Sequence, residues 1–187
     1  AAAFTTVRRL EDAGLTVALP SDWEVLTPDM DADNIAYTAA TQDFYADVLE
    51  WLADDDSVYM YAIEPVSLVT LIIYVEDHED GVDYRTESDG YMKTFVDEYN
   101  KGEHEGFSNC RAYLREVNGL RYMWSEYEPD SEDYYYLFTV LALDGVYYEV
   151  LLTSFDPISD TDRDLMSSVL ESTSYDAVSY SGRYLDP

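Results

Sequence analysis

Residues 134–154 read YYYLFTVLALDGVYYEVLLTS, and this stretch decides the fold class. Two long runs of leucine, β-branched and aromatic residues flank the dipeptide Asp144-Gly145. Aspartate and glycine both accept the positive φ angles of a two-residue type I′ turn, so the sequence predicts a β-hairpin. A two-residue loop also sets the register. The expected facing pairs are Leu143 with Val146, Leu141 with Tyr148, Thr139 with Val150, and Leu137 with Leu152.

Both faces of this predicted hairpin are apolar. The face opposite those pairs carries one charge, Glu149, among Ala142, Tyr147, Val140, Phe138 and Leu151. A hairpin in a two-layer protein normally keeps one polar, solvated face. We therefore expect this hairpin to be covered on both sides.

The remaining elements follow from periodicity and turn signals on either side of the hairpin. Asn118-Gly119 predicts a second hairpin between 111–117 and 120–128. Further strands are expected at 4–10, 15–19, 58–63 and 66–75, and helices at 41–53, from the Thr86/Asp89 capping pair to Lys101, and at 159–172. Short hairpins beside separated helices indicate an α+β fold, and apolar sheet faces indicate helices on both sides. The prediction is a three-layer α-β-α sandwich with a mainly antiparallel sheet, in which the two hairpins are adjacent.

Composition excludes several classes of protein. The 187 residues include 40 acidic and 10 basic side chains, for a net charge of −30, which opposes binding to a nucleic acid backbone. A single cysteine, Cys110, excludes an internal disulfide framework. No apolar run reaches 18 residues, so no transmembrane segment is expected. The acidity fits a salty or extracellular setting, or a docking surface for a basic partner or for cations.

The expected organisation is a single domain over 1–174 with a C-terminal tail at 175–187. The first residues, AAAF, show neither a basic region nor an apolar leader core. We expect a leader to have been removed, which predicts an extracellular or cell-envelope location and leaves the cytoplasm open.

The stretch DAGLTVALPSDWEV at 12–25 resembles the opening of PsbP-like domains. The Asp144-Gly145 hairpin, Thr153-Ser154-Phe155 and the helix through 166–169 resemble the end of the same domains. The resemblance spans about residues 4–174 and extends to DcrB-like exported bacterial lipoproteins. It implies an α-β-α sandwich, a binding or assembly role without catalysis, and a possible lipid anchor on a removed leader. The acidic segment 27–57 is longer than the family's connection, and no functional residue is carried over.

One segment partly matches a calcium loop. Asp29, Asp31 and Asp33 fall on alternate residues, as hard oxygen ligands do in such loops. Ala40 stands where a bidentate glutamate is required, so an ordinary acidic loop is the favoured interpretation. We expect no cofactor and no calcium requirement for folding. A calcium- or cation-responsive surface protein remains an alternative function.

The sequence offers little for catalysis. No G-x-S-x-G nucleophile motif occurs, His78 and His104 are expected to be solvated surface residues, and Cys110 is expected to be a structural thiol. The chain is therefore predicted not to be an enzyme. A hydrolase whose site assembles from distant residues remains a second alternative.

The segment 27–57 is the expected contact surface for a partner protein. In its helix Phe44, Val48, Trp51 and Leu52 form one apolar stripe, while Tyr45 and Leu49 flank that stripe. Aromatic anchors rimmed by acids suit a basic partner. The predicted partner-binding residues are Asp43, Tyr45, Asp47, Leu49 and Glu50. The alternative is that this helix only covers one sheet face. The 19 tyrosines also have two interpretations: they pack within the sheet, or they form a binding face for a partner.

Overall fold

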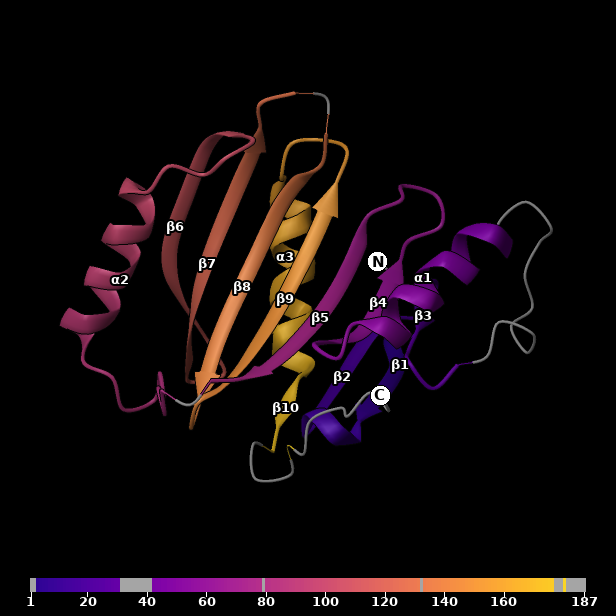
Figure 1. Cartoon of the computed structure of the whole chain (residues 1–187), viewed down its shortest axis with the longest axis horizontal. Coiled ribbons are helices and arrows are strands. Elements are labelled where there is room, and N and C mark those ends of the chain that lie inside the picture. Colours follow the sequence, from indigo (N-terminus) through magenta and orange to yellow (C-terminus); the bar gives the residue numbers. More distant parts are fainter. Residues whose placement is uncertain (1–2, 31–41, 79, 132, 177–179, 181–187) are drawn as a thin grey trace.

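A computed structural model describes residues 3–30, 42–78, 80–131, 133–176 and 180, except for the side chains of residues 42 and 43. Its main element is a seven-stranded, fully antiparallel sheet (Figure 1). From one edge to the other, the strands are β3 (Glu24–Leu26), β4 (Val58–Ile63), β5 (Thr70–Asp77), β9 (Val146–Ser154), β8 (Tyr135–Leu143), β7 (Leu120–Pro129) and β6 (Phe107–Val117).

A smaller antiparallel sheet and three helices complete the fold. The small sheet has the order β1 (Phe4–Leu10), β2 (Leu15–Pro20) and β10 (Ser174–Tyr175), with the short 3-10 helix η1 (Glu11–Ala13) joining its first two strands. The helices are α1 (Gln42–Asp54), α2 (Asp89–Lys101) and α3 (Asp160–Ser172). Helix α3 lies behind the large sheet, while α1 and α2 lie at opposite sides of its front (Figure 1). The α+β class and the layered arrangement are thus confirmed.

The two predicted hairpins are confirmed and adjacent. Asn118 and Gly119 have φ angles of 51° and 77°, and Asp144 and Gly145 have 52° and 86°, as a type I′ turn requires. The register of β8 against β9 is the predicted one, from Leu143 opposite Val146 to Leu137 opposite Leu152.

The last helix begins as predicted, whereas α2 does not. The Ser159 side chain accepts from the Asp162 backbone, and the Asp162 side chain accepts from the Ser159 backbone, which completes a capping box on α3. Helix α2 is capped by Ser88, whose hydroxyl accepts from the Tyr91 amide, and not by the expected Thr86. Thr86 instead lies in the preceding turn, where its hydroxyl donates to the Asp83 carbonyl.

The strand expected from residue 66 begins only at Thr70. The Glu64 carboxylate accepts from the Val66 and Ser67 amides, and Leu68 has a φ of 61°, so the intervening residues form a turn. These local bonds compete with the sheet ladder for the same backbone groups.

Two separate cores hold the layers together. The larger includes α3 behind the sheet, through Met166, Val169 and Leu170, with inward side chains of the small sheet, and it extends to the front beneath α2 through Met92 and Val96. The smaller lies beneath α1, against β3, β4 and β5. The front of the sheet is therefore packed only at its sides by the helices described.

Candidate binding surface

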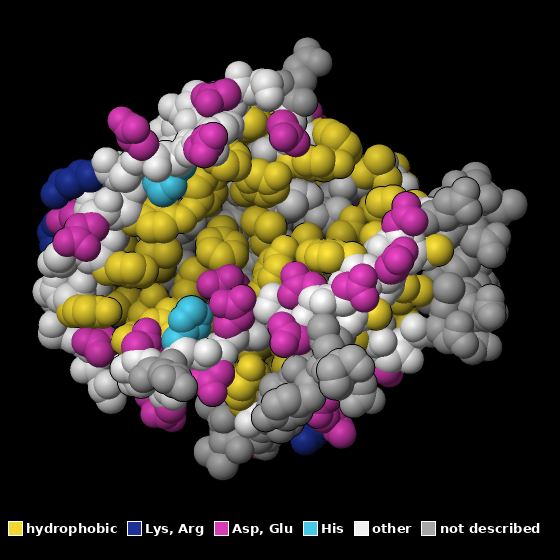
Figure 2. Space-filling model, viewed as in Figure 1, with side chains coloured by type: hydrophobic (Ala, Val, Ile, Leu, Met, Phe, Trp, Pro, Cys, Tyr) yellow, Lys and Arg dark blue, Asp and Glu magenta, His cyan; other side chains and the backbone are white. Residues whose placement is uncertain are grey.

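The centre of the sheet's front is half-open, which corrects the expectation that the second hairpin is covered on both sides. Phe138 on β8, Leu151 on β9 and Tyr74 on β5 are each only half-buried. Figure 2 shows the apolar side chains exposed between α1 and α2, over the middle strands. The part of this hairpin's front that carries Phe138 and Leu151 thus lies toward solvent, whereas Val140 and Ala142 on the same face are buried.

Strand register brings these side chains into one continuous row. Phe138 stands opposite Leu151, Leu151 opposite Ile72, and Ile72 opposite Tyr61. Trp51 of α1 borders the row, with its ring 6.3 Å from that of Tyr74. We call the half-buried members the front surface: Trp51, Tyr74, Tyr127, Tyr136, Phe138 and Leu151.

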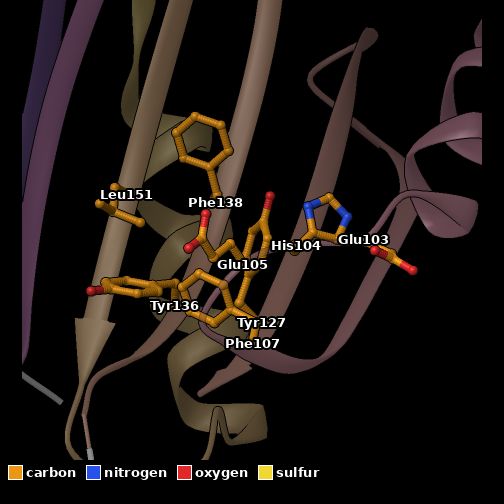
Figure 3. Close-up of a pocket in the computed structure, with 8 residues that line it drawn as sticks. All are labelled: Glu103, His104, Glu105, Phe107, Tyr127, Tyr136, Phe138 and Leu151. Atoms are coloured by element: carbon orange, nitrogen blue, oxygen red, sulfur yellow. The ribbon is translucent and has the colours of Figure 1, made fainter. Parts of the chain in front are cut away.

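A pocket of about 440 Å³ occupies the α2 side of the front surface. Its walls are Glu103, His104, Glu105, Phe107, Tyr127, Tyr136, Phe138 and Leu151 (Figure 3). Tyr127 is the central ring, with centroids 5.0 Å from Phe107 and 5.5 Å from His104. The carboxylate of Glu103 points away from the other labelled side chains. The pocket is therefore an aromatic recess with acids at its margin.

One carboxyl group lies within the front surface itself. Glu149 on β9 stands between Val140 of β8 and Tyr74 of β5, and it is half-buried. Burial raises the pKa of Glu149 to about 7, and the nearby charge of Glu76 adds to that rise, while His78 opposes it. The sequence alone shows Glu149 as a single charge among apolar neighbours. The structure adds that Glu76 and His78 of other segments lie near enough to affect its pKa.

Most of the described lysine and arginine side chains make their contacts away from this surface. Arg85, Lys93, Arg121 and Arg163 form ion pairs with carboxylates, and Arg111 and Arg115 lie over the rings of Tyr113 and Trp124. Lysine and arginine appear only at the periphery in Figure 2, whereas acidic side chains surround the apolar area. The front surface is thus apolar at its centre and negative at its edge.

The predicted anchors on α1 require a correction. Tyr45 and Leu49 are buried, with exposed fractions of 5% and 8%, because α1 packs the stripe Tyr45, Val48, Leu49 and Leu52 onto the sheet. The aromatic residues left at the surface are instead Phe44 and Trp51. Asp47 and Glu50 are exposed, whereas the side chain of Asp43 lies outside the described residues.

The two histidines differ in their surroundings. His78 is exposed, with Nε2 3.2 Å from Glu76 Oε2. His104 is half-buried in the pocket wall, with Nε2 3.1 Å from the Tyr99 carbonyl, so the expectation of a solvated surface residue is wrong for it. No spacing motif pointed to His104, because the Tyr127 ring that it contacts across the pocket comes from a strand distant in sequence.

The remaining candidates add no chemistry to the site. Cys110 is half-buried, and burial raises the pKa of its thiol to about 11, which opposes thiolate formation at neutral pH. Asp29 is exposed on the loop after β3, and Asp31 and Asp33 lie outside the described residues.

Among the described residues, no group of histidine, cysteine, aspartate and glutamate side chains could hold a metal ion. No helix in these parts of the chain is long and apolar enough to cross a bilayer.

Comparisons with known proteins show the fold alone. No family model matches the chain, and no curated protein matches it. The solution structure of cyanobacterial PsbP (CyanoP) from Synechocystis sp. PCC 6803 is similar, with a TM-score of 0.52 and 14% identity over 91% of each chain. A crystal structure from Bacteroides thetaiotaomicron VPI-5482 gives a TM-score of 0.49 at 11% identity, over 87% of this chain and 45% of that one. The first similarity supports a PsbP-like α+β fold.

Proposed function

We propose that this protein is a non-catalytic binding module, and that its front surface docks a polypeptide segment carrying both apolar and basic side chains. An exported or cell-envelope location is part of the same proposal, supported by the sequence resemblance and the acidic composition. The observation that carries the proposal is the half-buried aromatic area at the centre of the sheet.

The shape and composition of the front surface support docking. Five of its six members are aromatic, and large aromatic side chains supply contact area at low cost in conformational entropy. All of them except Trp51, which lies on α1, are mounted on strands of the seven-stranded sheet, so their positions are set before a partner arrives. A partner's apolar side chain would complete the burial of Phe138 and Leu151, and the pocket offers a recess for a larger one.

Charge complementarity selects the kind of partner. The described carboxylates at the margin include Glu103, Glu105 and Glu76, and the chain carries 30 net negative charges. A basic segment would be attracted at long range and held in register, whereas an acidic one would be repelled.

The residues of the pocket also support a non-catalytic role. The eight described residues that line it include no serine, threonine, cysteine or lysine, so its histidine and glutamates have no hydroxyl, thiol or amine nucleophile of these types beside them in the pocket wall. Cys110 of β6 stands opposite Tyr127 but does not line the pocket, and its raised pKa makes it a poor nucleophile.

Trp51 gives the test a reporter within the front surface. The other two tryptophans, Trp23 and Trp124, are 9% and 0% exposed, so acrylamide quenching reports mainly on Trp51. The probe is a twelve-residue peptide of alternating leucine and lysine. Two matched peptides replace either leucine by serine or lysine by glutamate. The leucine–lysine peptide should protect Trp51 from quenching, and both matched peptides should not.

Variants separate docking from general attraction to an acidic protein. Phe138→Ser with Leu151→Ser should weaken peptide binding at least tenfold, while Val7→Ser, at a 58% exposed position of β1, should leave it unchanged. Circular dichroism and thermal melts verify that each variant is folded. Equal binding by the double variant and the Val7 control would refute the front surface as the docking site.

A further inference from the structure

Glu149 is an isolated acid within an otherwise apolar area. Its neighbours across the strands are Val140 and Tyr74. Among the described residues, no side chain or backbone group donates a hydrogen bond to its carboxylate, and no cation forms an ion pair with it. A carboxylate removed from water without a partner is unfavourable, so a group that supplies the missing charge would gain free energy by binding there.

The groups around Glu149 do not supply that charge. Glu76 of β5 is negative, and Val140 and Ala142 of β8 are apolar. Burial is the main cause of the raised pKa values of Tyr74 of β5, Tyr84 of the following loop and Tyr99 of α2, and the nearby charge of Glu149 adds to each rise. His78 is the one described basic group that acts on Glu149, and it is already within hydrogen-bonding distance of Glu76.

We infer that Glu149 is the anchor for one cationic side chain, an ammonium or guanidinium group, of the polypeptide that docks on the front surface. This inference rests on the proposed function, because the cation is delivered by the docking segment. The apolar part of a lysine or arginine would cover Phe138 or Leu151, and its charged end would meet the carboxylate. The neighbouring tyrosine rings also favour a cation.

Docking is then linked to proton release. The ionised carboxylate is the form that a cation stabilises, and burial keeps part of the free protein's Glu149 protonated near neutral pH. Affinity should therefore increase as pH rises from 6 to 8, because a smaller fraction of Glu149 must lose a proton on binding.

The experiment measures binding of the leucine–lysine peptide at pH 6 and pH 8 by protection of Trp51. The wild-type protein should bind about fivefold to tenfold more tightly at pH 8. Glu149→Gln should lose most of this difference and bind more weakly at pH 8. Glu171→Gln, which removes an exposed acid from α3 behind the sheet, should keep the wild-type pH dependence.

The outcomes distinguish this inference from the proposed function. If Glu149→Gln keeps the wild-type pH dependence while Phe138→Ser with Leu151→Ser abolishes binding, docking holds and the anchor is wrong. If the double variant binds normally, docking itself fails. Spermidine tests for a free polyamine as the ligand. Protection of Trp51 by spermidine at the peptide's affinity, lost in Glu149→Gln, would overturn the assignment to a polypeptide side chain.

Discussion

Arg163 of α3 forms a two-point ion pair with Glu126 of β7, with both the Nε–Oε1 and Nη2–Oε2 distances at 2.8 Å. The Tyr113 hydroxyl also donates to Glu126, at 2.9 Å. The pair joins the last helix to the back of the large sheet. It contrasts with the front of the same sheet, where Glu149 has no described counterion.

Breaking this pair should destabilise the protein in a pH-dependent way. Hydrogen bonding from Arg163 lowers the pKa of Glu126 below its ordinary 4.5. A lowered folded-state pKa contributes stability that is present above about pH 4.5 and lost as pH falls through the lower value. Arg163→Met should therefore cost about 1–3 kcal/mol at pH 7 and progressively less below pH 4.5, as measured by denaturant unfolding.

An exposed ion pair provides the control for Arg163. Arg9 and Glu11 lie 3.3 Å apart with side chains 68% and 77% exposed. Arg9→Met should change the free energy of unfolding by less than about 0.5 kcal/mol, because solvent screens such pairs. Equal losses in the two variants would show that the Arg163 pair has no special role.

Replacing Glu149 should stabilise the protein at high pH. Its folded-state pKa is about 7, against an ordinary 4.5, so the wild type loses stability as pH rises from 4.5 through 7. The full shift corresponds to about 3 kcal/mol, and the partial exposure of the side chain reduces this to about 1–2 kcal/mol. Glu149→Gln should gain that amount at pH 8 and almost nothing at pH 4.5. A gain of the same size at both pH values, or in Glu171→Gln, would argue against burial as its cause.

The two type I′ turns should differ in their tolerance of alanine. Gly119 and Gly145 both have positive φ angles, so either substitution is strained by about 1–2 kcal/mol. A Cβ at Gly145 would lie 2.7 Å from the His78 carbonyl oxygen, whereas at Gly119 nothing lies within 4 Å. Gly145→Ala should therefore cost about 1–3 kcal/mol more than Gly119→Ala in thermal or denaturant unfolding. Equal costs would mean that the loop at His78 moves freely.

The stability of β6, the edge strand of the large sheet, should depend on hydrogen bonds from Asn100 of α2. Its side-chain amide donates to the Ala112 carbonyl at 2.8 Å and accepts from the Ala112 amide at 2.7 Å. When the backbone N–H and C=O groups of an edge strand are hydrogen-bonded in this way, they are not free to pair with another chain. Asn100→Ala should cost about 1 kcal/mol and increase hydrogen exchange at the Ala112 amide. Asn109→Ala, at an exposed position of β6, should leave that exchange rate unchanged.

The hairpins, their register and the α3 capping box could be predicted because each depends on residues close together in the sequence. Asp144 and Gly145 specify their turn almost alone, and the turn specifies every pair from Leu143 to Leu137. The sequence does not show which face of α1 is buried, because two adjacent residues are apolar in each of three turns. These pairs are Phe44 and Tyr45, Val48 and Leu49, and Trp51 and Leu52. A rotation of one residue exchanges the buried stripe for its neighbour.

Local sequence therefore specifies the helices and the longer strands, but not the short strands β3 and β10, together with the antiparallel pairing within each hairpin and the excess of negative charge. Which side of the sheet stays open depends on how the helices pack in three dimensions. Helices α1 and α2 pack at the two sides of the front, so Phe138, Leu151 and Glu149 remain half-exposed between them. The alternation of side chains along a strand shows that both faces are apolar, but it carries no information about where a helix distant in sequence will pack. That position depends on long-range contacts, which exist only once the chain has folded.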